Sequence, residues 1–425
     1  MLVYADFHLH SKYSRATSKE MWPDALEKYA KMKGLNLLGT GDITHPKYLQ
    51  VLKESLHEDG TGILRTKEGF TYVLQGEISL VYTQDGRSHR VHHLLLAPDF
   101  ATVDAINDWL DTKGRRDYDG RPIFGFSSIE LAERMHQINP RIMVIPAHAW
   151  TPWFSVFGSN SGFNSLQECF KDQTKRVHAI ETGLSSDPAM NWRVSSLDSV
   201  ALLSNSDSHS PWPWRMGREC NVFAFDDVFT YANITDAIKN RDKRHFLYTI
   251  EVDPAYGKYH WDGHRMCGVV LSPEESAKSN GVCPKCKQRL TIGVESRVNE
   301  LADRPVGFVP ENAIPFKTLL PLAEIISFVM KIKNPYAVHV RQEYEKLVKH
   351  FGNEFNVMLE TAESELATVT TAKIAEYIMK NRKAQIRTKP GYDGVYGEPI
   401  IDGDDGSYVR APVKTQTGQK TLGEF

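Results

Sequence analysis

The sequence contains little cysteine, almost no net charge and no long apolar run. Its 425 residues include five cysteines, which are too few and too unevenly spaced for a disulfide framework; three lie within residues 267–286 and indicate a metal site in a reducing compartment. The formal net charge of −2 predicts that any nucleic-acid surface is a local basic patch. No stretch reaches the roughly 18 apolar residues of a membrane span, and the first residues enter a strand without a signal-peptide pattern. We therefore expect a cytoplasmic monomer that does not contact membranes.

A metal-binding motif follows the first predicted strand. The apolar run Val3–Phe7 leads directly into the pattern Asp6-x-His8-x-His10. Because residues i and i+2 share one face of a strand, these three side chains are expected to point together. They would lie at the carboxyl end of the strand, where α/β folds bind their ligands. Two imidazoles and a carboxylate suit a divalent metal, although an isolated His-x-His is as often a pair of surface or capping histidines.

Five further predicted strands carry or end in the same kinds of side chain. They supply Asp42 and His45 after Leu35–Thr40, Glu77 within Tyr72–Val81, His92 and His93 before Leu94–Ala97, His148 after Ile142–Pro146, and Asp207 and His209 after Val200–Asn205. Six such strands in the first 210 residues favour a multinuclear metal site over a series of buried structural histidines. Helical spacing in Trp22–Lys33, Asp104–Lys113 and Ser128–Gln137 alternates with the strands and predicts a mainly parallel sheet or barrel.

These motifs resemble those of the polymerase-and-histidinol-phosphatase (PHP) domain family. The resemblance implies an α/β fold, a distorted (β/α)7 barrel, and metal-dependent hydrolysis of phosphate esters with three metal ions as the usual number. It implies the active-site metal ligands His8, His10, Asp42, His45, Glu77, His92, His148, Asp207 and His209, with Asp207, His148 and Glu77 as catalytic residues. In this chain Ile43 and Thr44 separate Asp42 from His45, which are adjacent in the family, and either His92 or His93 can fill the fourth motif. The mixed donor set suits Zn²⁺, Mn²⁺ or Fe²⁺ better than Mg²⁺.

A second metal site is predicted after residue 250. The spacing His264-x2-Cys267-x15-Cys283-x2-Cys286 matches a zinc-ribbon template in which one cysteine is replaced by histidine. His260 is the alternative fourth ligand. Four protein ligands close the coordination shell, so we expect a structural Zn²⁺ ion that stabilises a small zinc-ribbon-like domain.

The last third of the chain is predicted to be helical and then polar. Phe316–Lys331, Tyr336–Phe351 and Thr371–Lys383 show helical spacing. A basic cluster (Lys380, Arg382, Lys383, Arg387 and Lys389) and the aromatic, glycine-rich loop Gly391–Gly397 follow, and together they suit nucleic-acid backbone and base stacking; a solvated helix end is the alternative. We expect four regions: a metal-dependent nuclease domain in 1–250, the zinc-ribbon-like domain in 251–295, a helical DNA-binding domain in 296–400, and a disordered tail in 401–425. The tail ends in Gln419–Phe425, whose Gln-x-x-Leu-x-x-Phe pattern resembles a motif that docks replication sliding clamps.

The order of these regions, with the segments Tyr259–Arg265 and Glu300–Arg304, resembles the endonuclease Q family of DNA-repair enzymes. The resemblance implies hydrolysis of the phosphodiester bond 5′ to deaminated bases (uracil, hypoxanthine and xanthine) and to abasic sites, with damaged DNA as the partner. Clustered metals supply the hydroxide and the charge stabilisation that this chemistry needs. A small-molecule phosphatase of the histidinol-phosphatase type and an inactive binding module are the alternatives.

Recognition of a damaged base requires that the base be exposed, so we expect a flipped nucleotide. The loops 111–126 and 150–163 are long, and Trp150 is predicted to form one wall of the pocket. Asn205 is predicted to read the lactam edge of the base through its carboxamide, with Ser185 as a second partner; the alternative is that Asn205 caps a turn or orients a metal ligand.

Overall fold

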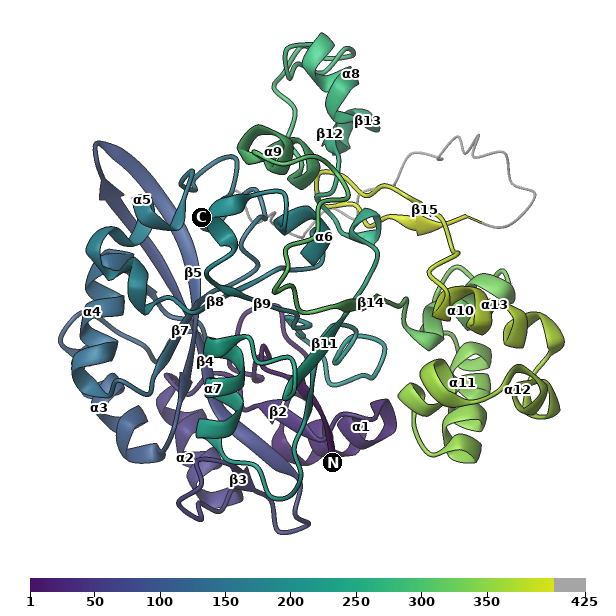
Figure 1. Ribbon diagram of the computed structural model, residues 1–425, viewed down its shortest axis with the longest axis horizontal. Helices are drawn as coiled ribbons and strands as arrows, with labels where there is room; N and C mark the ends of the chain where they lie inside the picture. The colour runs from purple at the N-terminus through teal and green to yellow at the C-terminus, as the bar shows by residue number, and fades with distance from the viewer. Residues whose placement is uncertain (401–425) are drawn as a thin grey trace.

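A ten-stranded mixed sheet forms the centre of the computed structural model, which describes residues 1–400 (Figure 1). Its strands run in the order β14 (Phe316–Thr318), β11 (Phe246–Glu251), β10 (Cys220–Ala224), β1 (Leu2–Asp6), β2 (Leu37–Gly39), β4 (Thr71–Gln84), β5 (Arg87–Ala97) and β7 (Met143–Pro146), and β3 (Leu64–Arg65) and β6 (Ile123–Phe124) also pair with β4. Apolar side chains pack against both faces of this sheet in two separate clusters.

The prediction of a mainly parallel sheet is wrong. β2 is parallel to both of its neighbours, β1 and β4, but β10 is antiparallel to β1, and β4 and β5 form a long antiparallel hairpin. Asp85 and Gly86 connect that hairpin with φ angles of 51° and 78°. This is the pair of left-handed residues that a tight hairpin turn requires, and it leaves no chain for a crossover helix. An Asp-Gly pair between two strand-like runs is a recognisable hairpin signal that our prediction did not use.

The sheet curls toward the ends of its strands. Two further parallel strands, β8 (Ala179–Glu181) and β9 (Ala201–Leu203), lie between the segment after β7 and the segment after β1. The Ala149 amide donates to the Glu181 carbonyl at 2.9 Å on one side. On the other side the Ser208 amide donates to the His8 carbonyl at 3.3 Å. The residues that follow β1, β7 and β9 therefore converge on one region.

Helices cover the sheet (Figure 1). They are α1 (Pro23–Lys33), α2 (Pro46–Ser55), α3 (Phe100–Asp111), α4 (Ser128–Ile138) and α7 (Tyr231–Asn240), with the shorter α5 (Leu166–Phe170), α6 (Pro188–Asn191), η1 (Lys171–Arg176) and η2 (Ser195–Leu197). The predictions of α1 and α4 are confirmed within one residue at each end. α3 begins four residues before its prediction because Asp99 caps it, accepting a hydrogen bond from the Thr102 amide.

Two smaller regions follow β11. The first contains η3 (Pro254–Tyr256), β12 (Asp262–His264), η4 (Arg265–Cys267), β13 (Val269–Leu271), α8 (Pro273–Lys278) and α9 (Val294–Leu301). The second contains α10 (Leu322–Val329), α11 (Val338–Phe351), the π-helix η5 (Asn356–Glu360), α12 (Glu363–Val369) and α13 (Ala372–Arg382), which share an apolar cluster. The prediction of one helix over Phe316–Lys331 is wrong at its start: β14 extends the sheet beside β11, and α10 begins only after Pro321.

The chain then returns to the first of these regions. Residues 388–399, which we call the clasp, include β15 (Thr388–Lys389) and β16 (Glu398–Pro399) (Figure 1). The Gly391 amide donates to the Ala255 carbonyl at 2.8 Å, and the Gly391 carbonyl accepts from the Trp261 amide at 3.0 Å. A Cβ atom at Gly391 would lie 2.2 Å from the Gly257 carbonyl oxygen, so only glycine fits this close approach. The predicted nucleic-acid loop Gly391–Gly397 is therefore packed within the fold.

Within residues 1–400, no helix combines the length and apolar character that crossing a membrane requires. The predicted disordered tail and its Gln419–Phe425 motif lie outside the described residues.

Candidate metal centre

Glu77, on β4, lies at the centre of the predicted ligands. Its buried Oε1 atom is 2.7 Å from His92 Nδ1 and 3.3 Å from His148 Nε2. Its Oε2 atom is 3.4 Å from His10 Nε2 and 3.5 Å from His8 Nε2. Two groups of possible metal donors result, His8 with His10 and Asp207, and Glu77 with His92 and His148, and the donor atoms of each group lie within 4.8 Å of one another. Strands far apart in the sequence thus converge as predicted.

The remaining predicted ligands surround His10. Asp207 Oδ1 lies 3.1 Å from His10 Nε2 and 3.6 Å from His209 Nδ1. On the other edge of the ring, Asp42 Oδ1 lies 3.2 Å from His10 Nδ1. The His45 ring instead stacks on Tyr13 with its centroid 4.3 Å away, and His45 belongs to neither donor group. The structure therefore brings Asp42 and His209 to the site and leaves His45 at its edge.

The buried atoms fit a metal ion. His8 is fully buried, and within residues 1–400 its Nε2 atom has no hydrogen-bond partner although it faces carboxylates. Burial acts to raise the pKa of Glu77, but His92, Arg121 and His8 outweigh burial and hold it well below its ordinary value. Burial likewise opposes ionisation of Asp207, yet His8, His209 and His10 hold the pKa of Asp207 well below its usual range. Ionised carboxylates beside an unpartnered imidazole nitrogen form a donor set for a divalent cation.

Glu181, at the end of β8, orients two of these ligands and was not predicted. His8 Nδ1 donates to its carboxylate at 3.0 Å, which directs His8 Nε2 toward Glu77 and Asp207. The His148 backbone amide donates to Glu181 Oε2 at 2.6 Å. A carboxylate behind a histidine ligand fixes both its tautomer and its orientation. The signal in the sequence is a short apolar run, Val177–Ile180, that ends in an acid.

Three predicted ligands have left-handed backbone conformations. The φ angles are 40° at Asp42, 32° at His148 and 46° at Asp207. Such angles are uncommon outside glycine, and they concentrate at functional sites whose surroundings hold them in place. Each of these residues follows a strand, so the turn directs its side chain toward the common centre.

Loop 111–126 contributes Arg121 to the centre. Its guanidinium donates to Glu77 Oε2 at 3.2 Å. The Gly120 amide donates to the Tyr13 carbonyl at 3.1 Å, and a Cβ atom at Gly120 would lie 2.0 Å from Asp42 Oδ2. The loop is therefore pressed against the ligands, and Arg121 supplies a positive charge at their edge.

The structure resolves both alternatives that the sequence left open. His92 contacts Glu77, whereas His93 points to the other face of β5, where its Nε2 atom lies 2.8 Å from the Ser128 hydroxyl. In the second site, the donor atoms of His264, Cys267, Cys283 and Cys286 lie within 4.8 Å of one another. His260 lies outside this group, and its Nε2 atom is 3.5 Å from Glu295 Oε2.

The second group is also electrostatically suited to a metal. Burial acts to raise the pKa of Cys283, but the backbone N–H groups of Cys286 and Lys285 outweigh it and lower that pKa to about 6. The thiolate is the form of cysteine that binds metals. Cys286 Sγ lies 3.3 Å from His264 Nδ1, so the two ligand pairs face each other.

Two predicted substrate contacts are not available in this structure. Trp150 is buried, packs on Phe157 and donates its indole N–H to Asn191 Oδ1 at 2.7 Å, so the prediction that it lines a pocket is wrong. Asn205 is also buried. Its Oδ1 atom accepts hydrogen bonds at 2.9 Å from the Phe7 amide and from Asn221 Nδ2. The acceptor needed for a bidentate contact with a base is therefore in use, and this geometry favours the alternative that Asn205 positions the end of β1.

The other predicted residues have structural partners. The Ser185 hydroxyl is buried and accepts from the Tyr259 amide at 3.3 Å. Asp6 does not face the ligands: its carboxylate accepts from the Ser206 and Gly217 amides at 3.0 and 2.9 Å, because the strand ends before the side chains can alternate as predicted. In the predicted basic cluster, Arg382 donates to three backbone carbonyls near η5, whereas Lys383 and Arg387 are exposed.

Other aromatic residues of loop 150–163 do lie at the centre. The Phe154 ring centroid is 4.7 Å from that of His92. Trp153 is 38% exposed, and its ring meets Tyr259 edge-on at 5.8 Å. We call the rings of Phe154, Trp153 and Tyr259 the aromatic border. It extends from His92 toward the region of β12.

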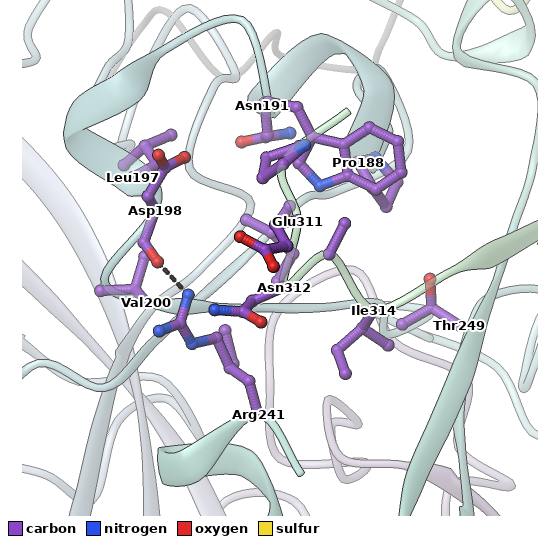
Figure 2. A pocket seen from close by; sticks show the side chains of 15 residues that line it. Pro188, Asn191, Leu197, Asp198, Val200, Arg241, Thr249, Glu311, Asn312 and Ile314 are labelled. Carbon is purple, nitrogen blue, oxygen red and sulfur yellow. Dashed lines mark hydrogen bonds between the residues drawn. The ribbon is translucent and has the colours of Figure 1, made fainter. Parts of the chain in front are cut away.

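A separate cavity of about 220 Å³ lies between β9, the end of α7 and residues 310–314 (Figure 2). Arg241 and Glu311 point into it, and none of the predicted site residues lines it. The metal centre is thus a cluster of donor side chains at the ends of strands, distinct from this cavity.

Comparison with known proteins identifies both partial and full-length relatives. Residues 321–385 match the family model described as the MJ0043 C-terminal domain. The uncharacterised protein MJ0043 of Methanocaldococcus jannaschii is 34% identical over 252 residues, and the match covers 59% of this chain and 31% of MJ0043. This chain therefore matches about a third of the length of that relative.

Two solved structures match nearly the whole chain. The crystal structure of the lesion-specific endonuclease PfuEndoQ from Pyrococcus furiosus superposes with a TM-score of 0.84 at 32% identity, covering 94% of this chain and 96% of PfuEndoQ. A complex of Endonuclease Q with a 27-mer duplex that carries an abasic lesion at the active site gives a TM-score of 0.85 at 32% identity, with coverage of 95% and 97%. The similarity thus extends over nearly the full length of both chains.

Proposed function

The chain belongs to the endonuclease Q family, and from that premise we propose that it is a metal-dependent DNA-repair endonuclease. It hydrolyses the phosphodiester bond 5′ to deaminated bases (uracil, hypoxanthine and xanthine) and to abasic sites. The abasic-lesion duplex bound at the active site of a relative supports this class of substrate.

The observation that carries the proposal is the position of Glu77 between two donor groups. Its two oxygen atoms face different sets of imidazoles, and His8 Nε2 has no partner among the described residues. His8, His10 and Asp207 would hold one divalent ion, and Glu77, His92 and His148 another, with Asp42 and His209 adjacent. This mixed nitrogen and oxygen set suits Zn²⁺ or Mn²⁺ better than Mg²⁺. When bound, such ions supply an activated water and stabilise charge on the phosphate.

The protein residues position these groups and handle protons. Glu181 keeps the His8 proton on Nδ1, and Ser155 Oγ, 3.1 Å from His148 Nδ1, orients the His148 ring. The Asp207 side chain is 32% exposed, whereas Glu77 is fully buried. Asp207 is therefore the proposed catalytic carboxylate, because it is the more accessible of the two to substrate and water. Arg121, whose side chain is 20% exposed, supplies positive charge at the same edge.

We propose that the aromatic border recognises the lesion. A flipped nucleotide needs a surface on which its base or sugar can rest, and Trp153 and Tyr259 offer one beside the metal centre. Ser185 supports Tyr259 through its amide, and Asn205 supports β1. Both residues predicted to touch the base are thus proposed to act as positioning residues.

The fold around this site is proposed to be a PHP barrel followed by a zinc ribbon. The hydrogen bonds that join β7 to β8 and β9 to β1 support closure of the barrel in 1–250. A structural Zn²⁺ ion held by His264, Cys267, Cys283 and Cys286 would organise 251–295. Residues 296–400 would form the helical DNA-binding domain, with Lys383 and Arg387 exposed to the DNA.

The partners beyond DNA follow from the sequence. The Gln419–Phe425 motif is proposed to dock a replication sliding clamp, and the enzyme is proposed to act as a cytoplasmic monomer. Its unpaired cysteines suit a reducing compartment.

The proposal is tested by incubating the protein with Mn²⁺ and end-labelled duplex DNA containing one uracil or one abasic site. We expect a single nick 5′ to the lesion. Asp207→Ala should abolish the nick with an unchanged unfolding temperature, whereas Asp227→Ala, an exposed acid, should cut like the wild type. A phosphomonoester is assayed in parallel. Release of phosphate without a nick would establish the phosphatase alternative, and the absence of both activities would establish a binding module.

A further inference from the structure

Three cationic side chains surround Tyr396 in the clasp. Arg218 Nη1 donates to the Tyr396 hydroxyl oxygen at 3.4 Å. The Arg215 guanidinium carbon and Lys258 Nζ lie 5.4 and 4.8 Å from the centroid of the Tyr396 ring. We call Arg215, Arg218 and Lys258 the cation cluster. Three separate segments meet here: residues 210–218, which follow the metal ligand His209, the segment before β12, and the clasp.

The cation cluster has no acidic partner within residues 1–400. Arg218 is 6% exposed, and its remaining N–H groups donate to the Ser206 carbonyl at 3.3 and 3.0 Å. Arg215 donates to the Tyr336 hydroxyl. The acid on the facing helix α10, Glu324, accepts from the Tyr256 hydroxyl at 2.8 Å. Burying cations without an anion costs free energy, so this arrangement favours binding of an anion.

The positive charge of the cluster favours ionisation of Tyr396. Burial acts to raise the pKa of the phenol, but Arg218, Lys258 and Arg215 outweigh burial and lower it to about 8. A site that stabilises a phenolate also stabilises a phosphate oxygen, because both carry a negative charge on oxygen.

The cluster is directly connected to the metal centre. The Ser206 carbonyl that Arg218 binds belongs to the residue before Asp207, and Asp207 faces His10. An anion held by the cluster would therefore bind next to the segment that carries Asp207, the proposed catalytic residue at the scissile phosphate. A DNA strand carries a phosphate at every nucleotide, so one chain can supply both anions.

We propose that the cation cluster is a binding site for a backbone phosphate of the DNA strand that enters the metal centre, with Tyr396 holding Arg218 in place. This inference rests on the proposed endonuclease function. The partly exposed Arg215 presents a planar group of N–H donors that matches phosphate oxygens, and the exposed Lys258 adds a charge at the rim. The buried Arg218, whose N–H groups donate to the Ser206 carbonyl and the Tyr396 hydroxyl, contributes its positive charge.

The test measures the binding of a fluorescent duplex with an abasic-site analogue at several salt concentrations. Each phosphate contact adds about 0.9 to the negative slope of log affinity against log salt. Lys258→Ala and Arg215→Ala should each weaken binding about tenfold and reduce the slope by ~0.5–1. Lys67→Ala is the matched control, because Lys67 is an exposed lysine in the turn between β3 and β4, at the end of the sheet opposite the metal centre; its slope should equal that of the wild type.

A second measurement identifies the phosphate. Neutral methylphosphonates replace the phosphates near the lesion one at a time. One replacement should weaken binding by the wild type about tenfold and have no further effect on Lys258→Ala. If both variants keep the wild-type slope, or if every replacement weakens DNA binding by Lys258→Ala as much as binding by the wild type, the proposed phosphate-binding site is refuted while the endonuclease function stands. If the wild type neither binds nor nicks lesion DNA, both proposals fail.

Discussion

Glu181→Gln is the substitution that most directly tests how the metal centre is assembled. It preserves the size of the side chain and removes one negative charge and one acceptor oxygen. The carboxylate now accepts from His8 Nδ1 at 3.0 Å and from the His148 amide at 2.6 Å. A carboxamide has a single acceptor oxygen, so its NH2 group must take either the Oε1 position, 3.0 Å from His8 Nδ1, or the Oε2 position, which faces the His148 amide.

Both orientations of the amide weaken the site. If its NH2 group faces His8 Nδ1, that nitrogen must become the acceptor, and the imidazole proton moves to Nε2, the atom intended for the metal. If the NH2 group faces the His148 amide, two donors oppose each other and the His148 backbone shifts. A hydrogen bond to a charged group contributes about 1.5–3 kcal/mol. Loss of a partner behind a ligand costs about 10–100-fold in metal affinity, which agrees with that range.

The assay is calorimetric titration of Mn²⁺ into protein freed of metal, with the Mn²⁺ dependence of nicking measured in parallel. We expect Glu181→Gln to need about 10–100-fold more Mn²⁺ for half-maximal binding and nicking. Glu251→Gln is the control, because Glu251 is equally buried but accepts from Thr249 and Thr182 rather than from metal ligands. Wild-type Mn²⁺ affinity in Glu181→Gln would refute the view that this carboxylate orients His8.

Three further outcomes are expected. Burial raises the pKa of Glu251 from 4.5 to about 8, so the folded state retains a proton that the unfolded state releases, and stability falls as the pH rises through this range. The free energy of unfolding, measured in urea, should therefore fall less between pH 5 and 8 for Glu251→Gln than for the wild type. The slopes of unfolding free energy against pH can differ between the two proteins by up to about 1.4 kcal/mol per pH unit. Cys283→Ser should lose one bound zinc by metal analysis and unfold at a lower temperature. Cys169→Ser, which changes a cysteine outside the second donor group, should keep its zinc. Equal zinc contents in the two variants would contradict the proposed zinc site. Trp150→Phe should lower the free energy of unfolding by about 1–3 kcal/mol and leave the affinity for lesion DNA unchanged. Trp153→Ala should weaken that affinity about tenfold at constant stability. The reverse pattern would show that Trp150, and not Trp153, lines the pocket.

The metal ligands could be predicted because their signal is local. A histidine or acid at or shortly after the end of a short apolar run is visible in a few consecutive residues, and His8, His148 and Asp207 all have this form. The four residues of the second donor group were equally visible through their spacing. Helices α1 and α4 followed from apolar periodicity together with Pro23 and Ser127 at their starts. Such patterns need no knowledge of which segments meet in space.

What could not be predicted depends on contacts between distant segments. Trp150 looked like a pocket wall because its loop is aromatic, but its partner Asn191 lies 41 residues away. Asn205 was predicted to read the base, yet the Phe7 amide that occupies its oxygen comes from the distant segment after β1. Arg382 was predicted to be part of a DNA-binding patch, but its guanidinium donates to a backbone carbonyl of η5. In each case the residue type was noticed, and its partner decided its role.

The clasp makes the order of synthesis matter for this enzyme. Segments fold largely from the N-terminus as they emerge, so His8 through His209 can converge before residues 388–399 exist. Until the clasp arrives, Arg218 lacks the Tyr396 hydroxyl and the segment around Ala255 lacks the Gly391 strand partner. A polypeptide cut short before residue 388 would thus carry every metal ligand and yet lack the contact that secures the loop beside Asp207. We therefore expect a DNA-cutting protein whose synthesis stops early to hold this loop less firmly than the complete enzyme does.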